Sequence, residues 1–146
     1  MVHFKPFVPE RFTSENVSID FFRHEEKSIM LVVLKGALPE GSKARPDCNY
    51  IKQQLEGNLL ALRPISLLLD MSQLKYSFGN SLIDALSPLF ELQVFESRFD
   101  IAFLLSDLNE YGLASLWNFD PGQPPKNIFF SHEAAVQYVE AAYDAL

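Results

Sequence analysis

The chain has 146 residues, of which 48% are hydrophobic and 21% are charged, and its formal net charge is −7. This balance is typical of one globular domain and not of a disordered chain, and the negative charge argues against a nucleic-acid-binding protein. The single cysteine excludes an internal disulfide and a cysteine-based zinc site, and no apolar run approaches the roughly 20 residues of a membrane span.

The N-terminal residues lack the apolar segment of a signal peptide, so we expect a cytoplasmic protein. The charge is uneven along the chain. Residues 1–73 carry nine basic and nine acidic side chains, whereas residues 74–146 carry three basic and ten acidic ones. An acidic half can steer a basic protein partner towards it, or it simply keeps the surface soluble.

Residues 1–16 show no periodic pattern and predict an irregular arm with apolar anchors at Phe4, Phe7 and Phe12. From residue 17 onwards the hydrophobic pattern becomes regular. We therefore expect an arm over residues 1–16 and one domain over residues 17–146.

Within the domain, strand-like and helix-like patterns follow in the order β-β-α-β-α-β-α-β-α. The expected elements cover residues 19–24, 28–34, 47–62, 66–70, 79–92, 101–106, 109–117, 128–130 and 131–146. A polar turn separates the first two strands and predicts a hairpin, and the later alternation predicts parallel strands with helical crossovers. The expected fold is a single α/β domain with a mixed central sheet flanked by helices.

Several residues indicate where the helices begin and what they bury. Asp47 is expected to be the N-cap of the first helix, and Ser131 that of the last, with Glu133 in its favourable first turn. Pro88 should kink its helix or split it in two. Cys48 lies on the apolar face of the first helix, which predicts a buried and inert thiol.

Motifs for catalysis are missing from the sequence. The six glycines form no phosphate-binding loop, and no Gly-x-Ser-x-Gly nucleophile motif is present. The histidines, which are His3, His24 and His132, do not pair at the spacing of metal ligands. We expect neither a cofactor nor a metal, and no enzyme activity.

Asp70 and Asp107 are the one acidic pair with alternative interpretations. Each follows or ends a predicted parallel strand, and ligand sites in open α/β sheets lie outside the carboxyl ends of such strands. The pair would suit a divalent cation, or a phosphoryl group as in a receiver domain. A receiver's first strand does not lead into a hairpin, however, so that element order does not fit. The simpler interpretation is that both residues cap turns or helices.

Residues 65–82 read ISLLLDMSQLKYSFGNSL. This segment resembles the central stretch of STAS domains, the family of bacterial anti-sigma-factor antagonists and of the C-terminal domains of sulfate transporters. In that family a buried strand ends in Asp, and a small residue and an apolar–aromatic pair follow. Asp70, Ser72, Leu74 and Tyr76 match these positions. The element order over about residues 17–146 also agrees.

The resemblance has one informative departure. The family's next helix opens with Asp-Ser-Ser-Gly, and its second Ser is phosphorylated in the regulated members. Phe78, Gly79, Asn80 and Ser81 stand at these four positions. Asn80 has no hydroxyl, so the resemblance implies an interaction module that lacks the family's phosphorylation switch at this position.

The same segment offers features of a docking surface. Asn80 is a good N-cap residue, and Tyr76 and Phe78 are expected to be exposed aromatic contacts. Ser77 and Ser81 are candidate modification sites. The alternatives are simple capping by Asn80 and Ser81, and burial of Tyr76 and Phe78 beneath the arm.

We therefore expect a non-catalytic protein–protein interaction module of a bacterial regulatory pathway. The expected partner-binding residues are Ser72, Tyr76, Ser77, Phe78, Gly79, Asn80, Ser81 and Asp84. By resemblance, the partner is a kinase-like anti-sigma factor or another STAS protein, and an apolar edge strand would allow a homodimer.

Two other functions stay open at this stage. One is binding of a small ligand, a nucleotide or a lipid, in a pocket between Asp70, Asp107 and Ser72. The other is an enzyme or a phosphoacceptor that uses Asp70.

Overall fold

The computed structural model describes residues 3–96 and 98–145. Its elements follow the predicted order, which confirms the α/β class. The strands are β1 (Val17–Arg23), β2 (Ile29–Ala37), β3 (Ser66–Lys75), β4 (Asp100–Leu104) and β5 (Ile128–Phe129). The helices are the short 3-10 helix η1 (Gly41–Ala44), followed by α1 (Arg45–Leu62), α2 (Ser81–Phe95), α3 (Glu110–Leu116) and α4 (His132–Asp144).

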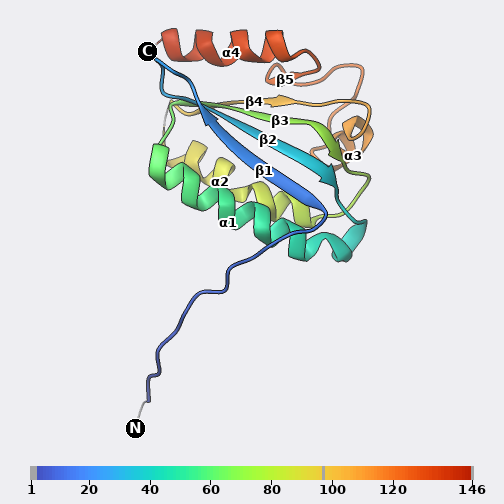
Figure 1. Ribbon diagram of the computed structural model, residues 1–146. Helices are drawn as coiled ribbons and strands as arrows, with labels where there is room; N and C mark the ends of the chain where they lie inside the picture. The colour runs from blue at the N-terminus through green and yellow to red at the C-terminus, as the bar shows by residue number, and fades with distance from the viewer. Residues whose placement is uncertain (1–2, 97, 146) are drawn as a thin grey trace.

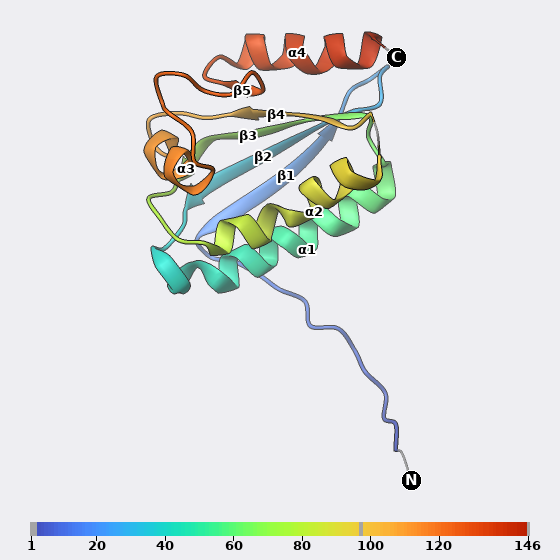
Figure 2. The same cartoon turned by 180° about the vertical axis from the view of Figure 1, so that it is seen from behind.

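The five strands form one mixed sheet in the order β1-β2-β3-β4-β5. β1 and β2 pair antiparallel, as the hairpin prediction requires, and each later neighbour pairs parallel. Helices α1 and α2 lie on one face of the sheet and α4 on the other, while α3 lies at the end to which β2 and β3 point (Figures 1 and 2). We refer to that end as the carboxyl edge of the sheet.

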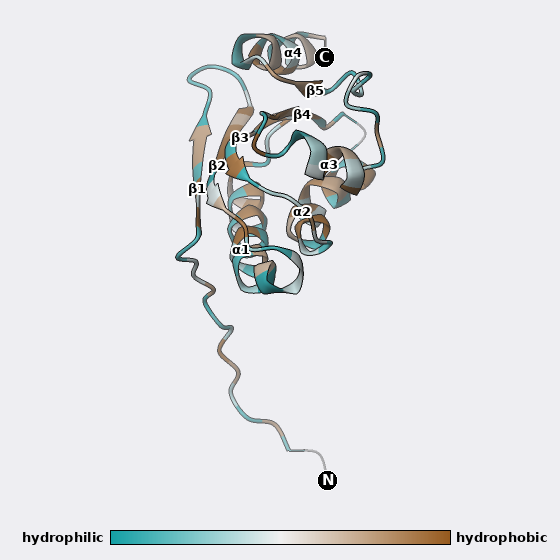
Figure 3. Cartoon of the chain, turned by 90° about the vertical axis from the view of Figure 1, so that its right-hand side faces the viewer, coloured by the Kyte–Doolittle hydropathy of each residue, from teal (hydrophilic) through white to brown (hydrophobic). Residues whose placement is uncertain are grey.

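Because side chains alternate along β3, this strand contributes to a hydrophobic core on each face of the sheet. Leu67 and Leu69 are fully buried between the sheet and α1 and α2. Leu68 faces the other way and packs with Ala135 and Val139 of α4. A strand buried on both faces reads as a continuous apolar run because neither face meets water. Figure 3 shows the apolar faces of α1 and α2 turned towards the sheet.

The first helix begins earlier than its sequence predicts. α1 starts at Arg45 with Pro46 in its first turn, and its N-cap is Ala44, so the assignment of Asp47 as N-cap is wrong. Proline favours this position because its fixed φ suits the first turn of a helix. Asp47 is instead buried, and its carboxylate accepts hydrogen bonds from Ser14 Oγ at 2.5 Å and Asn16 Nδ2 at 3.1 Å. These bonds join the segment before β1 to α1.

Two other helix predictions have different outcomes. Ser131 caps α4, and its Oγ accepts a hydrogen bond from Ala134 N at 3.3 Å, as predicted. α2 continues through Pro88 as one helix, so the proline does not split the helix in two. Among the described residues, no helix has both the length and the apolarity needed to cross a bilayer.

We expect Leu69→Ala to lower the free energy of unfolding by about 2–5 kcal/mol, because it leaves a cavity in the middle of the core. Leu60→Ala removes the same atoms from a side chain that is 68% exposed and should change stability far less. Urea unfolding of both variants measures the difference. Equal losses in the two variants would contradict the assignment of the core.

Candidate functional site

The candidate site begins with an irregularity in β3. The strand does not end at Asp70, as the sequence predicted, but continues to Lys75. Its register with β2 shifts there, because Val33 pairs with Asp70 whereas Lys35 pairs with Gln73. One extra residue on one strand of a pair is a β-bulge.

The carboxylate of Asp70 stabilises this bulge. Its Oδ1 accepts a hydrogen bond from Ser72 N at 2.9 Å and another from Ser72 Oγ at 2.6 Å. The extra residue also changes which positions face the core, because side chains alternate with a period of two. Before the bulge Leu69 and Met71 point to α1 and α2, and after it Leu74 and Tyr76 do so.

Beyond the end of β4, side chains take over the hydrogen bonds that a neighbouring strand would make. Asn109 Nδ2 donates to the carbonyls of Met71 and Leu74. Ser106 Oγ donates to Ser72 O at 2.7 Å. Both donors follow β4 in the chain, so the extended part of β3 is fixed to the N-terminal end of α3.

The loop between β3 and α2 is tightly packed. Tyr76 is buried, and its hydroxyl donates to Gly79 O at 2.7 Å. Burial raises the pKa of the Tyr76 hydroxyl, which keeps it protonated as a donor. Gly79 has a φ of 125°, and a Cβ there would lie 3.1 Å from the Cα of Gly41. Three loops that follow parallel strands therefore meet at the carboxyl edge.

The structure places the predicted partner-binding residues in two groups. Ser77, Phe78, Asn80 and Asp84 are exposed, whereas Ser72 and Gly79 are half-buried and Tyr76 and Ser81 are buried. The expectation of an exposed Tyr76 is therefore wrong, because the bulge turns its ring into the core.

Asn80 occupies the predicted N-cap position of α2, but its side chain makes no capping hydrogen bond. The carboxylate of Asp84 forms an ion pair with Lys52 at 3.1 Å. Of the two candidate modification sites, only Ser77 is accessible in the folded chain, because Ser81 is buried.

The helical pattern over residues 79–92 predicts that Ile83 faces inward, which is wrong, whereas Leu108 and Tyr111 were not singled out from the sequence. All three are exposed apolar side chains on segments that adjoin this loop. Ile83 lies in the first turn of α2, Leu108 follows β4 and Tyr111 lies in α3. Leu108 lies next to the loop because its carbonyl accepts from Tyr76 N at 3.2 Å. We call Phe78, Asn80, Ile83, Leu108 and Tyr111 the carboxyl-edge surface. Its members come from separate segments, so a local sequence pattern does not reveal it.

The acidic pair lies in two different environments. Asp70 is buried and hydrogen-bonded to Ser72, whereas Asp107 is exposed. The described residues contain no group of three or more side chains able to hold a metal ion. Two cavities of the described residues are lined by other residues, one between α1 and α2 and one beside the hairpin turn. The role of Asp70 seen here is to hold the bulge.

The thiol of Cys48, the single cysteine of the chain, is unreactive. Cys48 is buried on the inner face of α1. Burial, followed by the nearby charge of Asp47, raises the pKa of Cys48 from 9.0 to about 12. The thiol therefore stays protonated at neutral pH, which is the form that does not act as a nucleophile.

Comparison with solved structures agrees with the STAS-like fold. An anti-sigma factor antagonist from Mycobacterium paratuberculosis superposes with a TM-score of 0.58 at 16% identity, over 88% of this chain and 98% of that one.

Two further structures have lower scores. An antisigma-factor antagonist STAS domain from Rhodobacter sphaeroides gives a TM-score of 0.45 at 9% identity, over 68% of this chain and 96% of that one. An uncharacterized protein with a SpoIIAA-like fold from Shewanella loihica gives 0.46 at 18%, over 88% and 98%. No protein-family model and no curated protein matches the sequence. The superposition with a TM-score of 0.58 confirms the resemblance at the level of the fold.

The packing of α3 against the loop can be tested with two glycines. A Cβ on Gly112 would lie 2.7 Å from Ser77 O and 2.8 Å from Tyr76 Cδ2, whereas a Cβ on Gly57 meets nothing within 4 Å. We expect Gly112→Ala to lower the free energy of unfolding by about 1–3 kcal/mol through overpacking. Gly57→Ala should raise it by about 0.5–1 kcal/mol because alanine favours a helix. Thermal unfolding measures both changes, and a stabilising Gly112→Ala would refute the close packing.

Proposed function

We propose that this chain is a non-catalytic protein-interaction module of a bacterial regulatory pathway, acting in the cytoplasm, and that the carboxyl-edge surface binds its partner. The observation that carries the proposal is that exposed apolar side chains lie on segments that hydrogen bonds and close packing join at the carboxyl edge. Phe78 is 56% exposed, and Ile83, Leu108 and Tyr111 are also exposed on the adjoining segments. Exposed apolar clusters mark interaction sites more often than isolated apolar residues do.

The frame beneath these side chains favours binding. The hydrogen bonds of Asn109 and Tyr76 hold the loops in place before any partner arrives. A pre-ordered surface loses little conformational entropy on association. Aromatic anchors such as Phe78 and Tyr111 bury much area with few rotatable bonds, which is the character of a binding hot spot.

The likeness to an anti-sigma factor antagonist suggests the class of partner. We propose a kinase-like anti-sigma factor, or a second domain of the STAS-like fold. Asn80 is exposed at the start of α2 and cannot accept a phosphoryl group on a hydroxyl. Binding is therefore not controlled by phosphorylation of residue 80, and Ser77 is the exposed one of the two candidate modification sites.

Self-association is a further property of the proposal. β1 is an edge strand of the sheet, and its Phe22 is exposed on the face away from α1. Edge strands offer backbone groups that pair with another chain. A homodimer through β1 would leave the carboxyl-edge surface free, because that surface is built from the loops after β3 and β4.

We expect the wild-type chain to capture a specific partner from a lysate of its host, and the double variant Phe78→Glu, Asn80→Lys to lose it. The substitutions place charges in the centre of an apolar contact, where desolvation of an unpaired charge is costly. Quantitative mass spectrometry of the captured proteins measures the loss.

Phe22→Glu is the matched control, because Phe22 is exposed to a similar degree but lies on β1. This variant should retain the partner. Capture of the same protein by all three chains would show that the carboxyl-edge surface is not the binding site. Loss with Phe22→Glu alone would assign binding to the edge strand instead.

A further inference from the structure

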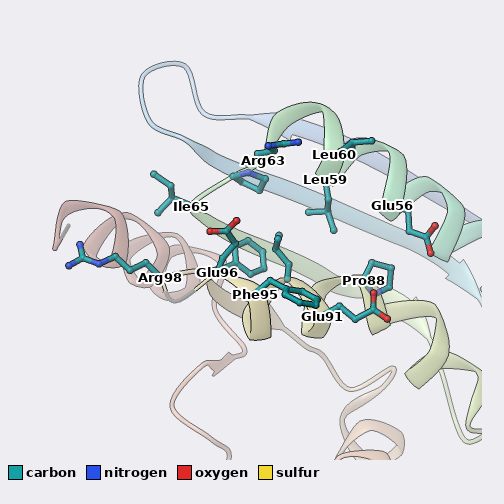
Figure 4. Close-up of a pocket in the computed structure, with 13 residues that line it drawn as sticks. Glu56, Leu59, Leu60, Arg63, Ile65, Pro88, Glu91, Phe95, Glu96 and Arg98 are labelled. Atoms are coloured by element: carbon teal, nitrogen blue, oxygen red, sulfur yellow. The ribbon is translucent and has the colours of Figure 1, made fainter.

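An apolar groove runs between the C-terminal halves of α1 and α2, on the side of the domain away from the carboxyl edge. Its volume is about 810 Å³. Figure 4 shows Leu59 and Leu60 on the α1 wall and Phe95 on the α2 wall. Leu60 and Phe95 are both largely exposed to water. The groove therefore presents apolar area that a suitable segment would cover.

The N-terminal arm also carries apolar side chains that are exposed to water. Phe4 is 91% exposed and Phe7 is 85% exposed, and Val8 is similar. The arm extends from the base of β1 away from the domain (Figures 1 and 3). Exposed phenylalanines cost free energy in water, because burying one side chain is worth about 1.5–3 kcal/mol.

The arm is attached to α1, the helix that forms one wall of this groove. Gln53 of α1 donates from Nε2 to Glu10 O at 2.8 Å, and its Oε1 accepts from Phe12 N at 2.9 Å. Residues 53, 56 and 60 are spaced by three and four, so they lie on one face of α1. Glu56 and Leu60 line the groove. The arm is thus fixed at the start of a stripe that leads into the groove.

The lengths of the two segments match. Seven residues of α1 separate Gln53 from Leu60, which is about 10 Å at the helical rise. In an extended chain, Phe7 lies about 10 Å from Glu10, and Phe4 lies about 20 Å from Glu10. Residues 4–9 can therefore reach the groove of the same molecule without releasing the bonds at Gln53.

The charges are complementary. Glu56, Glu91 and Glu96 stand among the residues that line the groove, with Arg63 and Arg98, which gives the walls a net negative charge. Within residues 4–9, Lys5 is the one charged side chain, and it is basic. Pro6 and Pro9 favour an extended backbone, which lowers the entropy lost when the segment is bound.

We propose that residues 4–9 of the arm bind in the α1–α2 groove of their own chain, with Phe7 and Phe4 as the anchors. The extended arm shown in Figure 1 is then the open form of an intramolecular contact. A tethered segment has a high effective concentration, so even a weak contact is occupied within one molecule. The proposal does not depend on the proposed function, because the groove and the carboxyl-edge surface lie at opposite ends of α2.

Paramagnetic relaxation tests the contact directly. A nitroxide is attached to the thiol introduced by His3→Cys in the 15N-labelled full chain. Cys48 does not compete for the label, because it is buried and its pKa is raised to about 12. We expect loss of amide signal intensity at Leu60, Phe95 and their neighbours, and not at α4.

Two variants of matched chemistry serve as controls. Leu60→Glu adds a carboxylate to the wall of the groove at an exposed position, so the fold is kept while the signal loss at Phe95 should disappear. Leu108→Glu makes the same change at an exposed site at the carboxyl edge and should leave the signal loss intact. Circular dichroism of both variants checks that they are folded.

A mixed sample distinguishes a contact within one chain from a contact between two chains. Nitroxide-bearing chains without 15N are combined with 15N-labelled chains without nitroxide. The proposal predicts no signal loss at the groove in this mixture. Loss in the mixture would show that the arm of a second copy occupies the groove and would overturn the intramolecular contact. Arm binding would be refuted altogether by either of two results. One is no signal loss at the groove when the nitroxide and 15N are on the same chain, and the other is signal loss that persists in Leu60→Glu.

Discussion

The side-chain amide of Asn109 is the contact on which the carboxyl edge depends. β3 extends beyond β4 by several residues, and the carbonyls that it turns away from β2 there have no neighbouring strand to bond them. Asn109 donates to the carbonyls of Met71 and Leu74 and is itself buried. Buried carbonyls without a donor are costly, so this amide allows the extension of β3. It also fixes α3 next to the loop that leads into α2, so that Leu108 and Tyr111 lie on segments joined to Tyr76 and Ser77.

Much of the fold follows from hydrophobic periodicity. The apolar run within residues 66–70 and the alternation of strands and helices predicted a mixed sheet with parallel pairs of strands. The bulge after Asp70 could not be predicted in this way, because it depends on hydrogen bonds between the carboxylate of Asp70 and Ser72. Without the bulge, Tyr76 has no reason to face the core, and the sequence alone suggested an exposed ring. Asp47 was misassigned for a similar reason, since its partners Ser14 and Asn16 lie about thirty residues away.

The candidate site was predictable only in part. The loop from Tyr76 to Asn80 and the exposure of Phe78 could be inferred from one segment of sequence. Leu108 and Tyr111 join it through tertiary packing, in which the absence of a Cβ on Gly112 lets α3 approach the Ser77 carbonyl. α2 thereby connects two surfaces of different character. Its first turn contributes to the carboxyl-edge surface, and its last turns form a wall of the groove near the arm.

The central claim is that the carboxyl-edge surface binds a protein, and hydrogen exchange on the purified complex with the captured partner tests it most directly. Amide exchange is compared residue by residue between the free and the bound chain. The account predicts that exchange slows from Ser77 to Asp84 and from Leu108 to Tyr111, with β1 and α4 unchanged. Slowing confined to β1 or α4, with the loop before α2 unaffected, would contradict it.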